Sequence, residues 1–204
     1  MADVVQDAPL GPRDLAAPPR RELRIVPVAG LPIAAVILVA LVVAIATDRL
    51  WALEFFHVAF GGLWTGVDLF LGFIVGPIIA RMSIGARVEF STRLMPKMVL
   101  LMPVLVTVTL TAGWQLASHL GYTSTEYFNH DWLVASYVVV GVMAIVALGV
   151  LEPANIAVLY ELRKPAPDGE LIARLMRRFV VTAGITGAMQ VATLVIMTKI
   201  ASGA

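Results

Sequence analysis

The chain has 204 residues, of which 59% are hydrophobic and only 14% are charged. Soluble domains carry roughly 25% charged residues, so this composition excludes a soluble globular fold and predicts an integral membrane protein. The formal net charge is +1 and the basic residues are dispersed over several loops, which argues against a nucleic-acid partner. The chain has no cysteine, so disulfides, thiolate metal sites, iron–sulfur clusters and covalently attached haem are excluded as well.

Residues 1–24 form a polar N-terminal segment rich in Pro, Asp and Arg. Such a segment cannot bury enough apolar surface to fold, and it is predicted to be a disordered cytoplasmic tail. The apolar segment that follows, from Ile25 to Thr47, exceeds the roughly 7–15 apolar residues of a secretory signal peptide. We therefore expect a retained membrane anchor rather than a cleaved signal.

Residues 25–204 are predicted to form a single membrane domain of five helices. Each apolar block exceeds the roughly 18 residues typical of a membrane helix, and a spanning backbone must satisfy its hydrogen bonds within the segment. Between Ile25 and Ala46 there is no titratable or amide side chain. An all-α integral membrane fold is therefore expected, with a peripheral first helix outside a four-helix core. The expected spans are about 26–47, 51–80, 96–118, 132–160 and 176–199.

The distribution of Lys and Arg predicts the orientation of these helices. Loops on one side, together with the N-terminal segment, hold 13 of the 15 basic residues, and the other side holds two. Under the positive-inside rule the richer side is cytoplasmic. Trp51 and Trp132 begin the second and fourth spans at the opposite interface, where amphipathic rings prefer to lie. The protein is thus predicted to be a multi-pass protein of the bacterial inner membrane, with a cytoplasmic N-terminus and an outer C-terminus.

The second span has a polar face that lipid would reject. At about 100° per residue, His57, Gly61, Trp64 and Asp68 fall close together around the helix, and Glu54 lies beside them. Inserting an ionisable side chain into the membrane costs at least roughly 2.5–3.5 kcal/mol, so such residues usually face the protein interior and mark function. We therefore expect this face to point into the bundle.

Two interpretations of this face remain open. In the structural one, His57 bonds to a neighbouring carbonyl, and Gly62 and Gly66 allow another helix to pack closely. In the functional one, His57 is an axial ligand of haem iron, and Gly61 clears room for the macrocycle. Haem b is the cofactor that this second interpretation predicts.

The other two histidines lie toward the same predicted outer face as His57. His119 ends the third span, and His130 precedes the fourth. This placement allows a haem near the outer leaflet. It also allows a mononuclear metal site in which His57, His119 or His130 joins Glu54 or Asp131.

A haem held between His57 and His119 is geometrically difficult. His57 lies about 8 Å below the outer boundary at 1.5 Å per residue, whereas His119 lies at that boundary or beyond it. The second axial position is therefore left open. Gln115 is level with His57, and we expect Gln115, His119 and Trp64 to line the pocket.

The cytoplasmic half of the spans contains a second group of polar residues. Glu152 and Asn155 flank Pro153 in the fourth span, near the predicted level of Asp68, and Pro153 should loosen the backbone because it lacks a donor. These residues could form a proton path toward the cytoplasm. Alternatively, the acids could pair with basic residues near the inner boundary, namely Arg81, Lys97 and Arg174.

Short motifs in the second and third spans resemble a known superfamily. They are the segment Phe56–Trp64, the segment Arg93–Pro96 and the segment Thr111–Trp114. Over roughly residues 51–118 the chain is similar to the superfamily of bacterial membrane protoporphyrinogen oxidases and copper-resistance D-type membrane proteins. The resemblance implies a four-helix haem b core with His57 as ligand. This chain departs from the oxidases, which have a basic residue near the haem, because none of its spans has a central Lys or Arg.

The leading functional prediction is a membrane-bound b-type haem protein that passes electrons between an outer partner and quinone, alone or within a larger complex. One alternative is a cofactor-free accessory subunit that packs against other membrane subunits. Another is a copper-handling protein or a small transporter that uses Asp68 and Glu152. The transporter has the least support, because neither an inverted repeat nor a matched pair of broken helices is evident.

Overall fold

The computed structural model describes residues 25–202, so the predicted tail at 1–24 lies outside the described residues. Within residues 25–202 every regular element is helical, and five helices are long and apolar enough to cross a membrane. The predicted all-α, five-helix membrane fold is confirmed. The spans are Val28–Ala46, Leu50–Arg81, Ile84–His119, His130–Leu162 and Gly169–Ser202.

Two of these spans contain a short π-helical segment. The first span consists of a 3-10 turn, η1 (Val28–Gly30), and α1 (Leu31–Ala46). The second consists of α2 (Leu50–Leu69), the π segment η2 (Phe70–Val75) and α3 (Gly76–Arg81). The third is α4 (Ile84–His119), the fourth consists of α5 (His130–Val146), the π segment η3 (Ala147–Leu151) and α6 (Glu152–Leu162), and the fifth is α7 (Gly169–Ser202).

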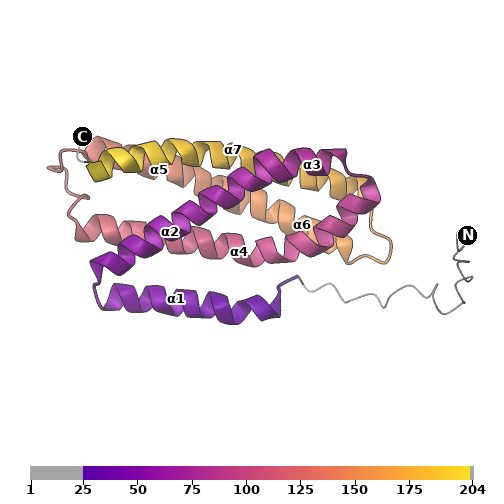
Figure 1. The fold of residues 1–204 in the computed structure, drawn as a ribbon, viewed down its shortest axis with the longest axis horizontal. Helices are drawn as coiled ribbons and strands as arrows, with labels where there is room; N and C mark the ends of the chain where they lie inside the picture. Colours follow the sequence, from indigo (N-terminus) through magenta and orange to yellow (C-terminus); the bar gives the residue numbers. More distant parts are fainter. Residues whose placement is uncertain (1–24, 203–204) are drawn as a thin grey trace, which may run out of the picture.

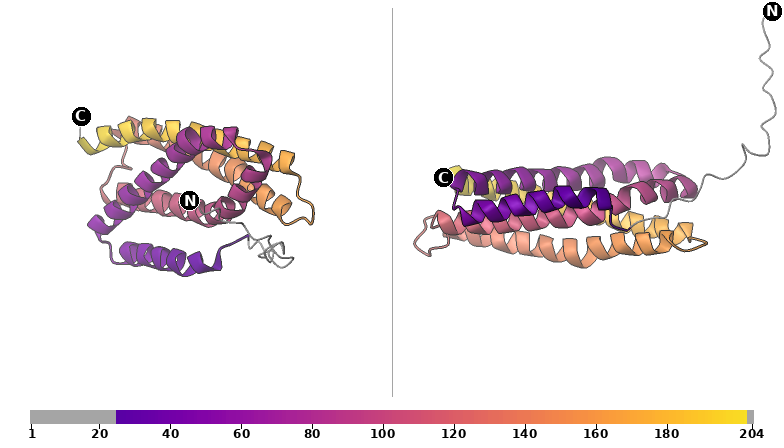
Figure 2. Two further views of the ribbon diagram at one scale, coloured as in Figure 1. Left: turned by 45° about the vertical axis from the view of Figure 1, so that its right-hand side comes forward. Right: turned by 90° about the horizontal axis from the view of Figure 1, so that it is seen from below.

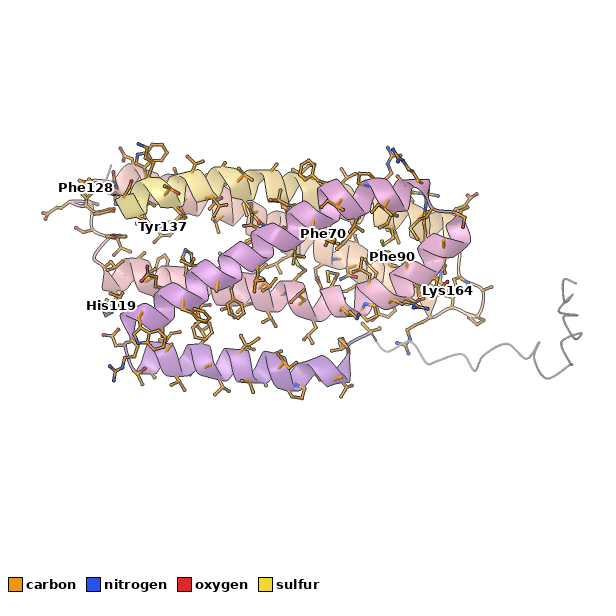
Figure 3. The ribbon with its side chains drawn as sticks, viewed as in Figure 1. Phe70, Phe90, His119, Phe128, Tyr137 and Lys164 are labelled. Carbon is orange, nitrogen blue, oxygen red and sulfur yellow. The ribbon has the colours of Figure 1, made fainter. Side chains whose placement is uncertain are left out.

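The last four spans form an elongated bundle, and α1 lies along one side of it (Figures 1 and 2). We call the end where α4 and α7 finish the His119 end, and the end where both begin the Arg81 end. His119 and Lys164 mark these two ends in Figure 3. Under the predicted orientation the His119 end would be the outer one.

The first helix is peripheral, as predicted. It contacts α2 and α4, and of its sixteen residues only Ala34, Leu41 and Ala44 are buried. An apolar helix with so little buried surface needs a lipid environment. The core of the bundle therefore consists of the other four spans.

Helices α4 and α7 begin well before the predicted spans, at the Arg81 end. α4 has 36 residues and α7 has 34, so each exceeds the roughly 30 Å of a bilayer core by about 20 Å. Local capping extends them beyond the apolar stretch: Ser83 Oγ accepts from Ala86 N at 3.3 Å, and Asp168 Oδ1 accepts from Leu171 N at 3.0 Å. Hydropathy identifies the membrane-spanning part of a helix, whereas capping side chains determine where the helix begins.

Glycine residues allow α2 and its π segment to approach α7 closely. A Cβ atom at Gly72 would overlap the backbone of Gly184, and one at Gly187 would lie 3.0 Å from the Leu69 backbone nitrogen. The predicted close packing at Gly62 and Gly66 is wrong, because a Cβ at either position meets no atom within 4 Å. Those two glycines are on the exposed side of α2.

A proline follows each π segment and accounts for it. Pro77 and Pro153 lack an N–H group and crowd the carbonyl four residues earlier, which is that of Phe73 in η2 and of Gly149 in η3. The turn widens to i→i+5 spacing to relieve this. Loosening at Pro153 was predicted. Both π segments contact the same helix, α7, and the spans that contain them remain continuous helices.

Candidate functional site

Asp68 is the most deeply buried acid in the bundle. Its side chain lies in the last turn of α2 before η2 and has no solvent exposure. Two side chains of α7 contact its carboxylate: Thr186 Oγ1 donates to Oδ2 at 3.0 Å, and Gln190 Nε2 donates to Oδ2 at 2.8 Å. Trp64, one turn earlier on α2, places its indole beside the same carboxyl. Two helices thus form a polar site in the centre of the membrane domain.

No basic side chain neutralises Asp68 within residues 25–202. The three ion pairs there join Arg93 to Glu89, His119 to Asp48 and Lys164 to Glu161. Predicted pairing with Arg81, Lys97 or Arg174 is wrong for Asp68, since Arg81 is roughly 20 Å farther along the helix at 1.5 Å per residue. Burying an ionised carboxylate at such a place costs free energy unless a cation pairs with it or a proton neutralises it.

Several buried polar atoms around Asp68 have no hydrogen-bond partner among the described residues. Three of them, Asp68 Oδ1, Gln190 Oε1 and Trp64 Nε1, belong to Asp68 and its neighbours, and the fourth, Thr109 Oγ1, belongs to a residue about two turns nearer the His119 end, which packs against Gly61. The four side chains are each more than nine-tenths buried. Buried polar groups are ordinarily satisfied by protein or by ordered water, so this concentration of unsatisfied atoms at one site points to a bound proton, water or ion.

Glu152 and Asn155 share no hydrogen bond with Asp68 within residues 25–202. Glu152 is half-buried where η3 passes into α6. Asn155 is completely buried against α4, where its amide donates to Met95 O at 3.2 Å and accepts from Val99 N at 3.0 Å. These two groups are the acceptor and the donor of one turn of α4, so Asn155 fastens α6 to α4.

Asn155→Ala should lower the thermal stability of the detergent-solubilised protein. The substitution removes both interhelical bonds, each of which is worth about 1 kcal/mol in membrane bundles, and leaves a small cavity in the core. Thermal unfolding followed by circular dichroism measures the effect. An unfolding temperature equal to that of the unmodified chain would show that Asn155 does not fasten the two helices.

His57 packs between α2 and α4. Its Nδ1 lies 3.0 Å from the backbone oxygen of Thr109, and the imidazole occupies the space above Gly113, where a Cβ would come within 2.6 Å of the ring. Gly61, expected to clear room for a macrocycle, instead faces the Thr109 methyl group, at 3.3 Å from a Cβ placed there. The structural interpretation of His57 describes this packing.

The other predicted site residues belong to separate surroundings. Trp64 lies beside Asp68, whereas His119 Nδ1 pairs with Asp48 Oδ1 at 2.8 Å at the end of the bundle. Gln115 is half-buried and Glu54 is exposed. Residues 25–202 hold no group of three or more His, Asp and Glu side chains close enough to share a metal ion, and the mononuclear metal site stays a prediction from the sequence.

This arrangement does not fit a haem. His57, Gly61, Trp64, Gln115 and His119 do not surround one cavity, and the face of Gly61 is covered by Thr109. One feature agrees with an axial ligand: the bond to the Thr109 carbonyl engages Nδ1 and leaves Nε2 available. Haem binding remains a prediction from the sequence.

The sequence pattern could have located part of the Asp68 site. Thr186 and Gln190 are four residues apart, on one face of the last span, and Gly187 lies next to Thr186. A polar pair with a neighbouring glycine is typical of a helix interface in membranes. Thr109 had no such signal, because an isolated threonine in a membrane helix commonly bonds to its own backbone.

Comparison of the chain with protein-family models, with curated proteins and with solved structures finds no match.

Proposed function

We propose that this protein moves protons across the membrane, alone or coupled to a solute, and that Asp68 is the carboxyl group that binds the proton. The observation that supports this most strongly is a fully buried acid that lacks a basic partner among the described residues. Intramembrane acids of this kind mark proton relays and ion paths. If the role of this side chain were purely structural, an amide would be enough, because an amide also forms hydrogen bonds between helices but has no ionisable group.

The two π segments support a transport role. Each lies beside a membrane acid, since Asp68 precedes η2 by two residues and Glu152 follows η3 directly. Single π-helical turns inside α-helices often accompany functional sites. Both segments contact α7, which also provides the partners of Asp68.

Proton flux into liposomes tests this proposal. The purified chain is reconstituted with a trapped pH-sensitive dye, and a potassium gradient with valinomycin drives proton entry. The unmodified chain should acidify the lumen faster than protein-free liposomes, and Asp68→Asn should lower the rate at least tenfold, because an amide does not bind a proton at neutral pH.

Glu89→Gln is the matched control, since Glu89 is an exposed acid that pairs only with Arg93 on the surface of α4. Its flux should equal that of the unmodified chain. Flux no greater than that of protein-free liposomes, or undiminished flux in Asp68→Asn, would contradict the proposal.

A further inference from the structure

The two halves of the bundle differ in how well their buried polar atoms are satisfied. Five buried side-chain atoms lack a hydrogen-bond partner within residues 25–202. All of them lie at the level of Asp68 or between that level and the His119 end. They belong to Trp64, Asp68, Thr109, His130 and Gln190.

Toward the Arg81 end the buried polar side chains have partners. Ser91 Oγ donates to Arg87 O at 2.7 Å, and Asn155 bonds to α4. Glu161 pairs with Lys164 at 2.6 Å and accepts from the Asp168 backbone nitrogen. Among the described residues of this half, no buried side-chain atom lacks a hydrogen-bond partner.

The core of the Arg81 half is also strongly apolar. Helices α4 and α7 fill it with long side chains that are at most 8% exposed, and these belong to a cluster that continues into the other half as far as Ala112. Flexible methionine side chains fill irregular gaps well. The residues are Met95, Met98, Met102, Met176 and Phe179.

Toward the His119 end the residues with unsatisfied atoms lie at successive levels along α2. Trp64 lies one turn from Asp68 and beside its carboxyl. Thr109 of α4 packs against Gly61, less than one turn farther along α2. From Gly61 to Asp68 the rise along the helix is roughly 10 Å, a distance that two or three water molecules in file can bridge.

We infer that water enters the bundle from its His119 end and reaches Asp68 along Thr109, Trp64 and Gln190, while the apolar core closes the Arg81 half. This inference rests on the proposed role of Asp68. An internal water needs two to four polar partners, and Asp68 Oδ1, Gln190 Oε1, Trp64 Nε1 and Thr109 Oγ1 provide acceptors and donors. A proton arriving as hydronium forms an O–H bond at Asp68 Oδ1 and leaves one water molecule behind. Under the predicted orientation this access is from outside the cell.

Hydrogen–deuterium exchange at Asp68 tests the path. The protonated carboxyl gives an infrared C=O band that disappears in Asp68→Asn and shifts in heavy water. In the unmodified chain the shift should follow solvent exchange quickly. Thr109→Val keeps the shape of the side chain but removes the hydroxyl, and it should slow the shift at least tenfold.

Thr107→Val is the matched control, because Thr107 lies on the same helix with an exposed side chain, and it should exchange at the normal rate. An unchanged rate in Thr109→Val would overturn the inferred path and leave the proposed function standing. Absence of any band that depends on Asp68 would overturn the proposed function itself.

Silver-ion accessibility tests the direction of entry. Because the chain has no cysteine, each single substitution introduces the sole thiol. Thr123→Cys and Ala166→Cys, in exposed loops at the His119 and Arg81 ends, define the two sides of a membrane vesicle. Ag⁺ added to one side binds an accessible thiol. After the protein is denatured, a thiol that has bound Ag⁺ is protected from maleimide labelling.

Thr109→Cys should be protected from the same side as Thr123→Cys, whereas Met98→Cys should be protected from neither side. Val108→Cys serves as the buried control next to Thr109, and it should also remain unprotected. Protection of Thr109→Cys from the side of Ala166→Cys, or from neither side, would overturn the inferred direction.

Discussion

Gly72→Ala is expected to destabilise the bundle by about 3 kcal/mol, the upper range for overpacking a core. A Cβ atom at this position overlaps the backbone of Gly184, and a backbone cannot move aside as a flexible side chain can. Helix α7 must therefore shift away from α2. The shift would also separate Asp68 from Thr186 and Gln190, so the loss of stability should be accompanied by a loss of proton flux.

The measurement is thermal unfolding of the detergent-solubilised protein, with Gly66→Ala as the control. Gly66 lies on the same helix, but a Cβ there meets no atom within 4 Å. Because alanine favours a helix over glycine by roughly 1 kcal/mol, Gly66→Ala should leave stability unchanged or slightly raised. Equal unfolding temperatures for the two variants would show that the Gly72 contact does not hold α2 and α7 together.

Pro77→Ala is expected to lower proton flux at least tenfold without lowering stability. Alanine restores the N–H group that can bond to the carbonyl of Phe73, so η2 should return to a regular α-helix. A regular α-helix in place of η2 would rotate α2 relative to α3, and it would remove the π segment beside Asp68. Flux into liposomes and the unfolding temperature together measure the effect.

Pro103→Ala is the matched control for that substitution. Pro103 lies inside α4, which remains α-helical throughout, so its replacement removes no π segment. Flux in Pro103→Ala should stay close to that of the unmodified chain. Full flux in Pro77→Ala would contradict a functional role for the π segment η2.

The membrane fold was predictable because lipid imposes a simple requirement on the sequence. Every spanning segment must be long, apolar and helical, and each of the five predicted spans lies within or close to an observed helix, although α4 and α7 begin earlier than predicted. The peripheral position of α1 followed from its lack of polar side chains. The inward placement of Trp64 and Asp68 followed from their shared helical face, and both are buried.

Other features depended on how helices face one another, which hydropathy does not determine. Glu54 lies near the Asp68 face but is exposed, since a long side chain close to the end of a span can reach the polar interface. Gly62 and Gly66 have the spacing of a packing motif, yet the contact with α7 is made by Gly72. The haem prediction assumed that Gly61 faces open space, and the Thr109 methyl group fills that space instead.

Chemical modification tests whether Asp68 is the group that carries the proton. Dicyclohexylcarbodiimide reacts with protonated carboxyl groups in apolar surroundings and forms a stable adduct that mass spectrometry can locate. We expect an adduct on Asp68, loss of proton flux in proportion to its formation, and neither effect in a chain that carries Asp68→Asn. Undiminished flux after complete modification of Asp68 would contradict this role.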